Sequence, residues 1–285
     1  MSNIHKNLKF AFIVARNAAL QINFVNQIEQ ILAKFNITAL YDKETAKNIA
    51  KSGLSHDEIF AKTKLIISIG GDGNFIAVCR KYAQNEAFVF GVHTGHLGFL
   101  TDVTIDKFEH YFSEFLDGNY EIQKPNLLEA KFIKGSQITI KQAFNDIVFM
   151  RKKIKSITQI EAFLDKKHFN SYIGDGVIIS SAMGSTAYNM SAGGAIIYPK
   201  CEVFSLTPVC SHSLTQRPLI LPSKFKVEFI SNDDVSVIID GQESLDMKNY
   251  DKIEVGVSKF SANIIYHKDR DYFGVLKQKL RWGHE

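Results

Sequence analysis

The stretch "LIISIGGDGNF", residues 65–75, joins an unbroken apolar run to a glycine-rich turn that carries an aspartate. The run 65–69 has the length and β-branching of a strand buried on both faces, as in a parallel sheet covered by helices. Gly70 and Gly71 then allow a sharp turn and a close approach to a ligand, because glycine has no β-carbon. Asp72 is therefore predicted at the carboxyl end of a central strand, where open α/β sheets bind ligands, and the stretch indicates a nucleotide site.

The segments around this strand continue the same pattern. Strands are predicted at residues 8–14, 37–41 and 88–92. Apolar residues at spacings of three and four between Phe24 and Phe35 predict an amphipathic helix that covers a sheet. Strands that alternate with helices are typical of βαβ units, so an α/β domain with a parallel sheet is predicted at residues 1–120.

The pattern changes to short strand-like runs after residue 120. Asp240 and Gly241 follow the run "VSVII" and predict a hairpin turn, so a β-rich second domain is predicted at residues 121–262. Helical spacing returns only in "DYFGVLKQKLRW". A C-terminal helix is therefore predicted at residues 263–285, packed back on the first domain.

Composition limits the class of protein. The chain has 285 residues, 45% of them hydrophobic, and a net charge of +4, as expected of a globular protein. The basic cluster 151–155 is interpreted as a solvated strand end, so nucleic-acid binding is the weakest alternative. Three cysteines without a C-x-x-C pair argue against a zinc site and for a reducing, cytoplasmic compartment, and the apolar run 10–14 is too short for a membrane span.

Two further stretches carry candidate binding groups. The segment "GSTAYNMSAGG", 184–194, gathers hydroxyl and amide side chains at a predicted helix start, which suits phosphate or ribose, with Tyr188 against a base. The alternative is a capped helix in which those side chains satisfy the backbone. Asn145 and Asp146 interrupt an apolar strand pattern, and they require each other, a turn, or a ligand such as an adenine amino group or a ribose diol. No P-loop motif and no complete dinucleotide fingerprint is present.

Taken together, these motifs resemble the NAD kinase family along nearly the whole chain. Although the GGDG turn also occurs in diacylglycerol-kinase-like and phosphofructokinase-like enzymes, seven blocks in the family's order are far more specific. The blocks are "GGDGN", "GVHTGHLGFLTD", "FNDIV", "DGVIISSAMGSTAYNMSAGGAIIYP", "TPVCSHSLTQRPLILP", "DGQ" and "DYFGVLKQKLRWG".

The resemblance implies a fold and an activity. It implies a Rossmann-like α/β domain followed by an all-β sandwich domain, an NAD kinase/diacylglycerol kinase-like architecture, and assembly as a homodimer or homotetramer. It also implies transfer of a phosphoryl group from ATP, or from polyphosphate, to the 2′-hydroxyl of the adenosine ribose of NAD. Mg²⁺ is expected to arrive on the nucleotide rather than in a dedicated protein site.

The same resemblance implies roles for individual residues. Asp72 is the expected catalytic carboxylate, which accepts the proton of the ribose hydroxyl. The residues expected near the ATP phosphates are Gly70, Gly71, Gly73 and Asn74. The residues expected to contact NAD are Asp72, Gly73, Asn145, Asp146, Asp175, Thr186, Ala187, Tyr188, Asn189, Met190, Ser191 and Gln242.

The sequence departs from the NAD kinase pattern at three places, and two other functions are alternatives. Asp146 stands where many members have Glu, His93 replaces a common Asn, and Ala182-Met183 replaces a frequent Thr-Pro or Ser-Pro. His93 and His212 are interpreted as packing or loop residues. The alternatives are a lipid or sugar kinase that shares the GGDG turn, and an NAD-sensing module without catalysis.

Overall fold

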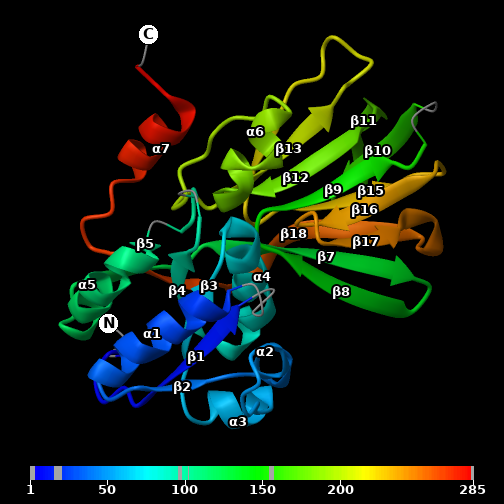
Figure 1. The fold of residues 1–285 in the computed structure, drawn as a ribbon. Coiled ribbons are helices and arrows are strands. Elements are labelled where there is room, and N and C mark those ends of the chain that lie inside the picture. Colours follow the sequence, from blue (N-terminus) through cyan, green and yellow to red (C-terminus); the bar gives the residue numbers. More distant parts are fainter. Residues whose placement is uncertain (1–3, 16–20, 96–97, 102, 154–156, 284–285) are drawn as a thin grey trace. The chain divides into compact units, whose positions relative to one another are not determined.

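The computed structural model of the chain describes residues 4–15, 21–95, 98–101, 103–153 and 157–283. The chain divides into two compact units, which are described separately here (Figure 1). Unit 1 comprises residues 1–124 and 262–285, and unit 2 comprises residues 125–261. Five residues of the motifs quoted above lie outside the described ranges: His96, Leu97, Asp102, Ile154 and Lys155.

Unit 1 is built on a seven-stranded sheet with the order β2-β1-β3-β4-β19-β6, to which β5 adds by pairing with β4. All its pairings are parallel except that of β19 with β6. The central position of β3 confirms the strand predicted at residues 65–69. The strands are β1 (Phe10–Ala15), β2 (Thr38–Leu40), β3 (Leu65–Ile69), β4 (Phe88–His93), β5 (Val103–Thr104), β6 (Tyr120–Gln123) and β19 (Asn263–His267).

Helices cover both faces of this sheet, which confirms the α/β class of the first part. Val25 and Phe108 belong to the core under α1 and α5, while Phe12 on the other face packs edge-on against Phe60 and Tyr82. The helices are α1 (Ile22–Lys34), α2 (Lys43–Asn48), α3 (His56–Phe60), α4 (Asp72–Tyr82), α5 (Ile105–Leu116) and α7 (Tyr272–Leu280), with a 3-10 turn η1 (Ala83–Asn85).

The prediction of a helix at residues 263–285 is wrong for the first part of that range. Residues 263–267 form β19, which pairs in parallel with β4 and antiparallel with β6. Because the strand lies between two others, Ile264 and Ile265 are buried. A short apolar run of this kind is typical of a central strand. The helix α7 occupies only residues 272–280.

Unit 2 consists of two six-stranded sheets. Their orders are β11-β10-β15-β18-β7-β8 and β14-β13-β12-β9-β16-β17, and every pairing in them is antiparallel. The strands are β7 (Asn126–Lys134), β8 (Gln137–Ala143), β9 (Asp146–Arg151), β10 (Thr158–Leu164), β11 (Lys167–Gly174), β12 (Gly176–Ser181), β13 (Val203–Val209), β14 (Leu219–Pro222), β15 (Lys226–Ile230), β16 (Val235–Ile239), β17 (Glu243–Asp246) and β18 (Lys252–Ser261). Short helical turns are η2 (Met183–Thr186), α6 (Tyr188–Ser191) and η3 (Met247–Asn249).

The two sheets of unit 2 share one apolar core, so the predicted β-sandwich is confirmed. Phe149 of one sheet and Phe229 of the other lie with ring centroids 4.7 Å apart. Asp240 and Gly241 have φ values of 49° and 64°, the left-handed backbone that a tight β16–β17 hairpin requires, and this confirms the predicted turn. In the described residues, no helix has the length and apolar character that a membrane crossing requires.

Candidate active site

Asp72 opens helix α4 directly after the central strand β3. All five residues of β3 are buried. The chain leaves the strand through Gly70, whose φ of 146° is open to glycine, and Gly71 takes the N-cap position without a side-chain cap. A β-carbon built on Gly71 or Gly73 meets no described atom within 4 Å. The turn therefore offers space and helix N-terminal N–H groups beside a carboxylate, an arrangement that suits phosphate.

The carboxylate of Asp72 is held by the segment that follows β4. Its Oδ2 accepts a hydrogen bond of 2.8 Å from the Phe99 N–H, and its Oδ1 accepts bonds from the Thr101 N–H at 3.2 Å and the Thr101 hydroxyl at 3.0 Å. A β-carbon on Gly98 would lie 1.9 Å from Oδ1, so only glycine lets the segment approach this closely. Sequence reasoning did not assign these contacts to Phe99 or Thr101, because nothing local links them to Asp72.

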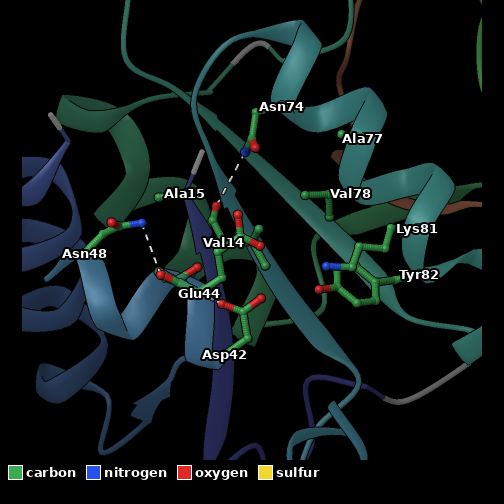
Figure 2. A pocket seen from close by; sticks show the side chains of 11 residues that line it. Val14, Ala15, Asp42, Glu44, Asn48, Asn74, Ala77, Val78, Lys81 and Tyr82 are labelled. Atoms are coloured by element: carbon green, nitrogen blue, oxygen red, sulfur yellow. Dashed lines mark hydrogen bonds between the residues drawn. The ribbon is translucent and has the colours of Figure 1, made fainter. Parts of the chain in front are cut away.

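A cavity of about 310 Å³ lies beside α4 in unit 1, and Figure 2 shows its lining. Asn74, predicted near ATP, borders it and donates through its amide to the Ser68 hydroxyl at 3.0 Å and the Ile69 carbonyl at 3.0 Å. Its amide also faces the Val14 carbonyl at 3.5 Å. The remaining lining comes from β1, from α2 with its cap and from α4: Ala15, Asp42, Glu44, Thr45, Asn48, Ala77, Val78, Lys81 and Tyr82.

In unit 2, Asn145 and Asp146 lie where the chain enters β9, and a third residue organises them. Asp240 accepts hydrogen bonds from three consecutive backbone N–H groups: that of Phe144 at 2.9 Å, that of Asn145 at 2.8 Å and that of Asp146 at 3.1 Å. The Asp240 N–H in turn donates to the Asp146 carbonyl at 3.0 Å. Sequence analysis assigned Asp240 only to a hairpin turn, although its place in the "DGQ" block was a signal.

The side chains of the pair are buried. Asn145 is 9% exposed and Asp146 5% exposed. The Asn145 Oδ1 has no hydrogen-bond donor among the described residues. Burial, with a smaller contribution from the negative charge of Asp240, raises the pKa of Asp146 to about 7.

The last residue of β12 and the turn η2 that follows it hold the other side of Asn145. The Ser181 N–H donates to the Asn145 carbonyl at 2.9 Å, and the Ser181 hydroxyl donates to the Phe144 carbonyl at 2.7 Å. A β-carbon on Gly184 would lie 2.2 Å from the Asn145 carbonyl oxygen. Glycine at 184 therefore allows η2 to lie directly on the Asn145 peptide.

A helix starts within the segment 186–191, as the sequence predicts, but it is short. The segment comprises the end of η2 and the four-residue α6. The Asn189 amide donates to the Ser185 and Ala195 carbonyls, both at 3.1 Å, and its oxygen accepts from Ser205 at 3.1 Å and Thr207 at 2.6 Å. Asn189 is fully buried, and these four hydrogen bonds hold its side chain inside the loop. Its role is to fix the loop.

The other predicted residues of this segment differ in exposure. Thr186, Ala187 and Met190 are half-buried, and Ser191 is exposed. Tyr188 is 41% exposed. Tyr188 and Ser191 are therefore the most accessible side chains of this segment.

Tyr188 lies within electrostatic range of Asp146 and of Asp175 in unit 2. Burial, and to a smaller extent the charges of Cys210, Asp175 and Asp146, raises the pKa of Tyr188, so these groups share one electrostatic environment. Asp175 is also paired with Arg151, at 2.8 Å between Nε and Oδ1.

The basic cluster is largely paired with carboxylates. Arg151 pairs with Asp175, Lys152 with Asp246, and Lys153 with Asp234 at 2.9 Å. These ion pairs agree with the interpretation of the cluster as a solvated strand end.

The predicted residue Gln242 and the two histidines His93 and His212 differ in exposure. Gln242 is exposed in the β16–β17 turn, directly after Asp240 and Gly241. His93 is 3% exposed at the end of β4, and His212 is exposed. Within the described ranges no group of three or more His, Cys, Asp or Glu side chains could hold a metal ion.

Comparison with known families gives two matches that together cover most of the chain. Residues 10–120 match the ATP-NAD kinase N-terminal domain, and residues 144–267 match the ATP-NAD kinase C-terminal domain. The chain is 42% identical over 283 residues to an NAD kinase of Campylobacter jejuni, with 98% of each chain covered. It is 35% identical over 281 residues to an NAD kinase of Sulfurimonas denitrificans, covering 98% of this chain and 99% of the relative.

Solved structures share the fold. The crystal structure of yeast NADH kinase complexed with NADH superposes with a TM-score of 0.84 at 22% identity, covering 98% of this chain and 89% of the yeast chain. An NAD kinase from Archaeoglobus fulgidus in complex with ATP gives a TM-score of 0.77 at 24% identity, covering 95% of this chain and 98% of the archaeal chain. From the matched domains and the identities over nearly its full length, the chain belongs to the NAD kinase family.

Proposed function

We propose that this protein transfers the γ-phosphate of ATP to the 2′-hydroxyl of the adenosine ribose of NAD and so produces NADP. The observation that carries the proposal is Asp72, a carboxylate held at the N-terminus of α4 between two glycines with open space around them. Family membership and the names of the relatives, which are NAD kinases, support the same reaction. A lipid or sugar kinase is not favoured, because the matches cover both domains of an NAD kinase.

Asp72 acts as the general base in this proposal. A carboxylate has about four acceptor directions, two on each oxygen. The described residues use two directions at Oδ1 and one at Oδ2, so Oδ2 retains an acceptor for the ribose hydroxyl. Because the Phe99 and Thr101 donors fix the carboxylate, it needs little reorganisation when the hydroxyl loses its proton to the attack on phosphorus.

The ATP site is proposed in unit 1. Gly70, Gly71, Gly73 and Asn74 surround the start of α4, whose N–H groups suit the phosphates. The 310 Å³ cavity beside α4 suits the adenosine, since Asp42 and Glu44 can accept hydrogen bonds from its amino and hydroxyl groups. Mg²⁺ enters as part of the Mg·ATP substrate, carried by the phosphate oxygens and water. Polyphosphate as donor is the alternative.

The NAD site is proposed around the Asn145–Asp146 pair in unit 2. A buried acceptor without a partner costs about 1–3 kcal/mol, so the Asn145 Oδ1 is suited to a donor group of the ligand. Tyr188 supplies an exposed ring for a base. The residues proposed to contact NAD are Asp72, Gly73, Asn145, Asp146, Asp175, Thr186, Ala187, Tyr188, Met190, Ser191 and Gln242.

Three wider properties belong to the same proposal. The domains are residues 1–120 with the C-terminal segment, and residues 121–262, each close to one of the compact units. The protein is a homodimer or homotetramer. It works in the cytoplasm and takes no nucleic acid or membrane partner.

The test is a substrate comparison with purified protein and Mg·ATP. NAD should yield NADP and ADP in equal amounts, whereas diacylglycerol, sphingosine and fructose 6-phosphate should yield none. Binding of NAD without ADP release would identify an NAD-sensing module instead. Parallel reactions with GTP and polyphosphate define the phosphoryl donor.

A further inference from the structure

The carboxylate of Asp240 is the least expected feature of unit 2. Asp240 belongs to the β16–β17 hairpin turn, yet its carboxylate accepts hydrogen bonds from the backbone at the start of another strand, β9. It accepts the N–H groups of Phe144, Asn145 and Asp146 within 3.1 Å. Three consecutive N–H groups can converge on one carboxylate only when the backbone curves around it, as in an anion-binding nest. The left-handed φ of 49° at Asp240 places its side chain in that position.

The Asn145 peptide is consequently fixed from both ends. Its N–H donates to Asp240, and its C=O accepts from Ser181 while Gly184 packs against it. The chain bends between β8 and β9 instead of continuing as a strand. Without the bend, the strand alternation would carry Asn145 and Asp146 to opposite faces of the sheet.

We propose that Asp240 is a positioning residue for nucleotide binding: its carboxylate holds residues 144–146 in the conformation that presents Asn145 and Asp146 to the adenosine of NAD. This inference rests on the proposed function, since it names what orients the proposed NAD-binding pair. Asp240 touches no substrate in this role. It acts through the backbone that carries the pair and through its negative charge.

The charge of Asp240 has an effect that a purely structural hydrogen bond would not have. Two titratable groups face Asp146 from neighbouring elements: Asp240 on the β16–β17 turn and Tyr188 on α6. The strand β12, which pairs with β9 at Asp146, contributes the uncharged Ser180 there. Tyr188 stays neutral near pH 7 because its pKa is raised. Asp240 is therefore a neighbouring negative charge that adds to the effect of burial and raises the pKa of Asp146 further.

The direction of the pH effect follows from the ligand groups. Ionised Asp146 accepts hydrogen bonds from the adenine amino group or the ribose hydroxyls, so NAD binds more tightly as the pH rises through about 7, the pKa of Asp146. Removal of the Asp240 charge lowers that pKa and moves the rise in affinity to lower pH.

The experiment measures NAD binding by calorimetry, and KM for NAD and for ATP, across the pH range about 5 to 9. Asp240→Asn suits it, because Asn tolerates the left-handed backbone but replaces one acceptor oxygen with an amide donor. We expect the Kd and KM for NAD to rise at least about tenfold on the alkaline plateau, while the KM for ATP stays within about twofold. We also expect the midpoint of the pH profile to move to lower pH.

Asp251→Asn is the matched control. Asp251 lies directly before β18 in the other sheet of unit 2, where its carboxylate accepts from the Gly135 N–H at 2.7 Å and its own N–H donates to the Ile133 carbonyl at 2.8 Å. This variant weakens a hydrogen bond from a backbone N–H to a carboxylate that does not involve Asn145 or Asp146. Its NAD affinity and pH profile should match those of the wild type.

The outcomes separate this inference from the proposed function. If the wild type neither binds nor phosphorylates NAD, the proposed function fails. If the wild type is active and folded Asp240→Asn keeps both its NAD affinity and its pH midpoint, the positioning role is overturned.

Should Asp240→Asn not fold, Asp240→Gly keeps the turn without the carboxylate, and wild-type NAD affinity in that variant would overturn the proposal equally. Should neither variant fold, amide exchange in the wild type decides: NAD should slow exchange at residues 144–146, and unchanged exchange there contradicts the proposal.

Discussion

The hydroxyl of Thr101 donates to the Oδ1 of Asp72 at 3.0 Å, across 29 positions of the chain. Thr101 is 2% exposed, so water does not compete for this bond. Together with the N–H groups of Phe99 and Thr101, the hydroxyl fixes the orientation of the proposed base. In the proposed function, the described residues 98–101 after β4 therefore orient the base through hydrogen bonds.

Thr101→Val removes the hydroxyl and keeps the size and shape of the side chain. The carboxylate loses one of its three holding bonds, a change of about 1 kcal/mol, and kcat is expected to fall roughly five- to tenfold. Thr101→Ser keeps the hydroxyl and should retain most of the activity. Steady-state kinetics with NAD and ATP check both variants, and equal kcat values for Val and Ser would contradict the role of the hydroxyl.

Gly98→Ala tests the close approach of the same segment. The new β-carbon would lie 1.9 Å from Oδ1 of Asp72, so the carboxylate or the segment must move. We expect kcat to drop by about a hundredfold or more, because misplacement of a base by an ångström is that costly. Gly95→Ala is the control, since a β-carbon there meets no described atom within 4 Å. A similar loss of kcat in both variants would contradict this explanation, because it would show that any substitution in this loop lowers kcat, whether or not it displaces Asp72.

Ala77→Leu tests the proposed adenosine site beside α4. Ala77 lines the cavity, and a leucine at this position fills part of it (Figure 2). The KM for ATP should rise by about tenfold or more while the KM for NAD stays near the wild-type value. Ala77→Ser leaves the cavity open and should behave as the wild type. A normal KM for ATP in the leucine variant would place the adenosine elsewhere.

Asp146 also links stability to pH. Its pKa is about 7 in the folded protein, well above the ordinary 3.8, so the folded state binds this proton more tightly than the unfolded chain does. The stabilisation is complete below the ordinary pKa and is lost as the pH rises through about 7, by up to about 4 kcal/mol. Calorimetric unfolding without ligand should therefore show a smaller decrease in thermal midpoint, between about pH 5 and pH 8, for Asp146→Asn than for the wild type. Parallel decreases in the two proteins would contradict the raised pKa.

Much of the fold is predictable from local sequence patterns. The strand at 65–69, the helix between Phe24 and Phe35 and the Asp240–Gly241 hairpin all follow from spacing, burial and turn chemistry. The strand β19 does not, because an apolar run as short as residues 264–266 is compatible with helix or strand until its neighbours β4 and β6 are known.

The candidate site is predictable only in part, for a physical reason. Asp72, Asn145 and Asp146 stand out because a polar group in an apolar context needs a partner. The residues that hold them, Thr101 and Asp240, are distant in sequence and look like ordinary turn residues. The internal hydrogen bonds of Asn189 are not predictable from its glycine-rich block either, because two of their partners, Ser205 and Thr207, lie on the strand β13.

The central claim is that Asp72 takes the proton from the ribose hydroxyl, and Asp72→Asn tests it most directly. The amide keeps the size of the side chain but cannot serve as the base. We predict that the rate of NADP formation at saturating NAD and Mg·ATP falls by about a hundredfold to ten-thousandfold, while the calorimetric Kd for NAD stays within about threefold of the wild-type value. An unchanged turnover in this variant would contradict the account.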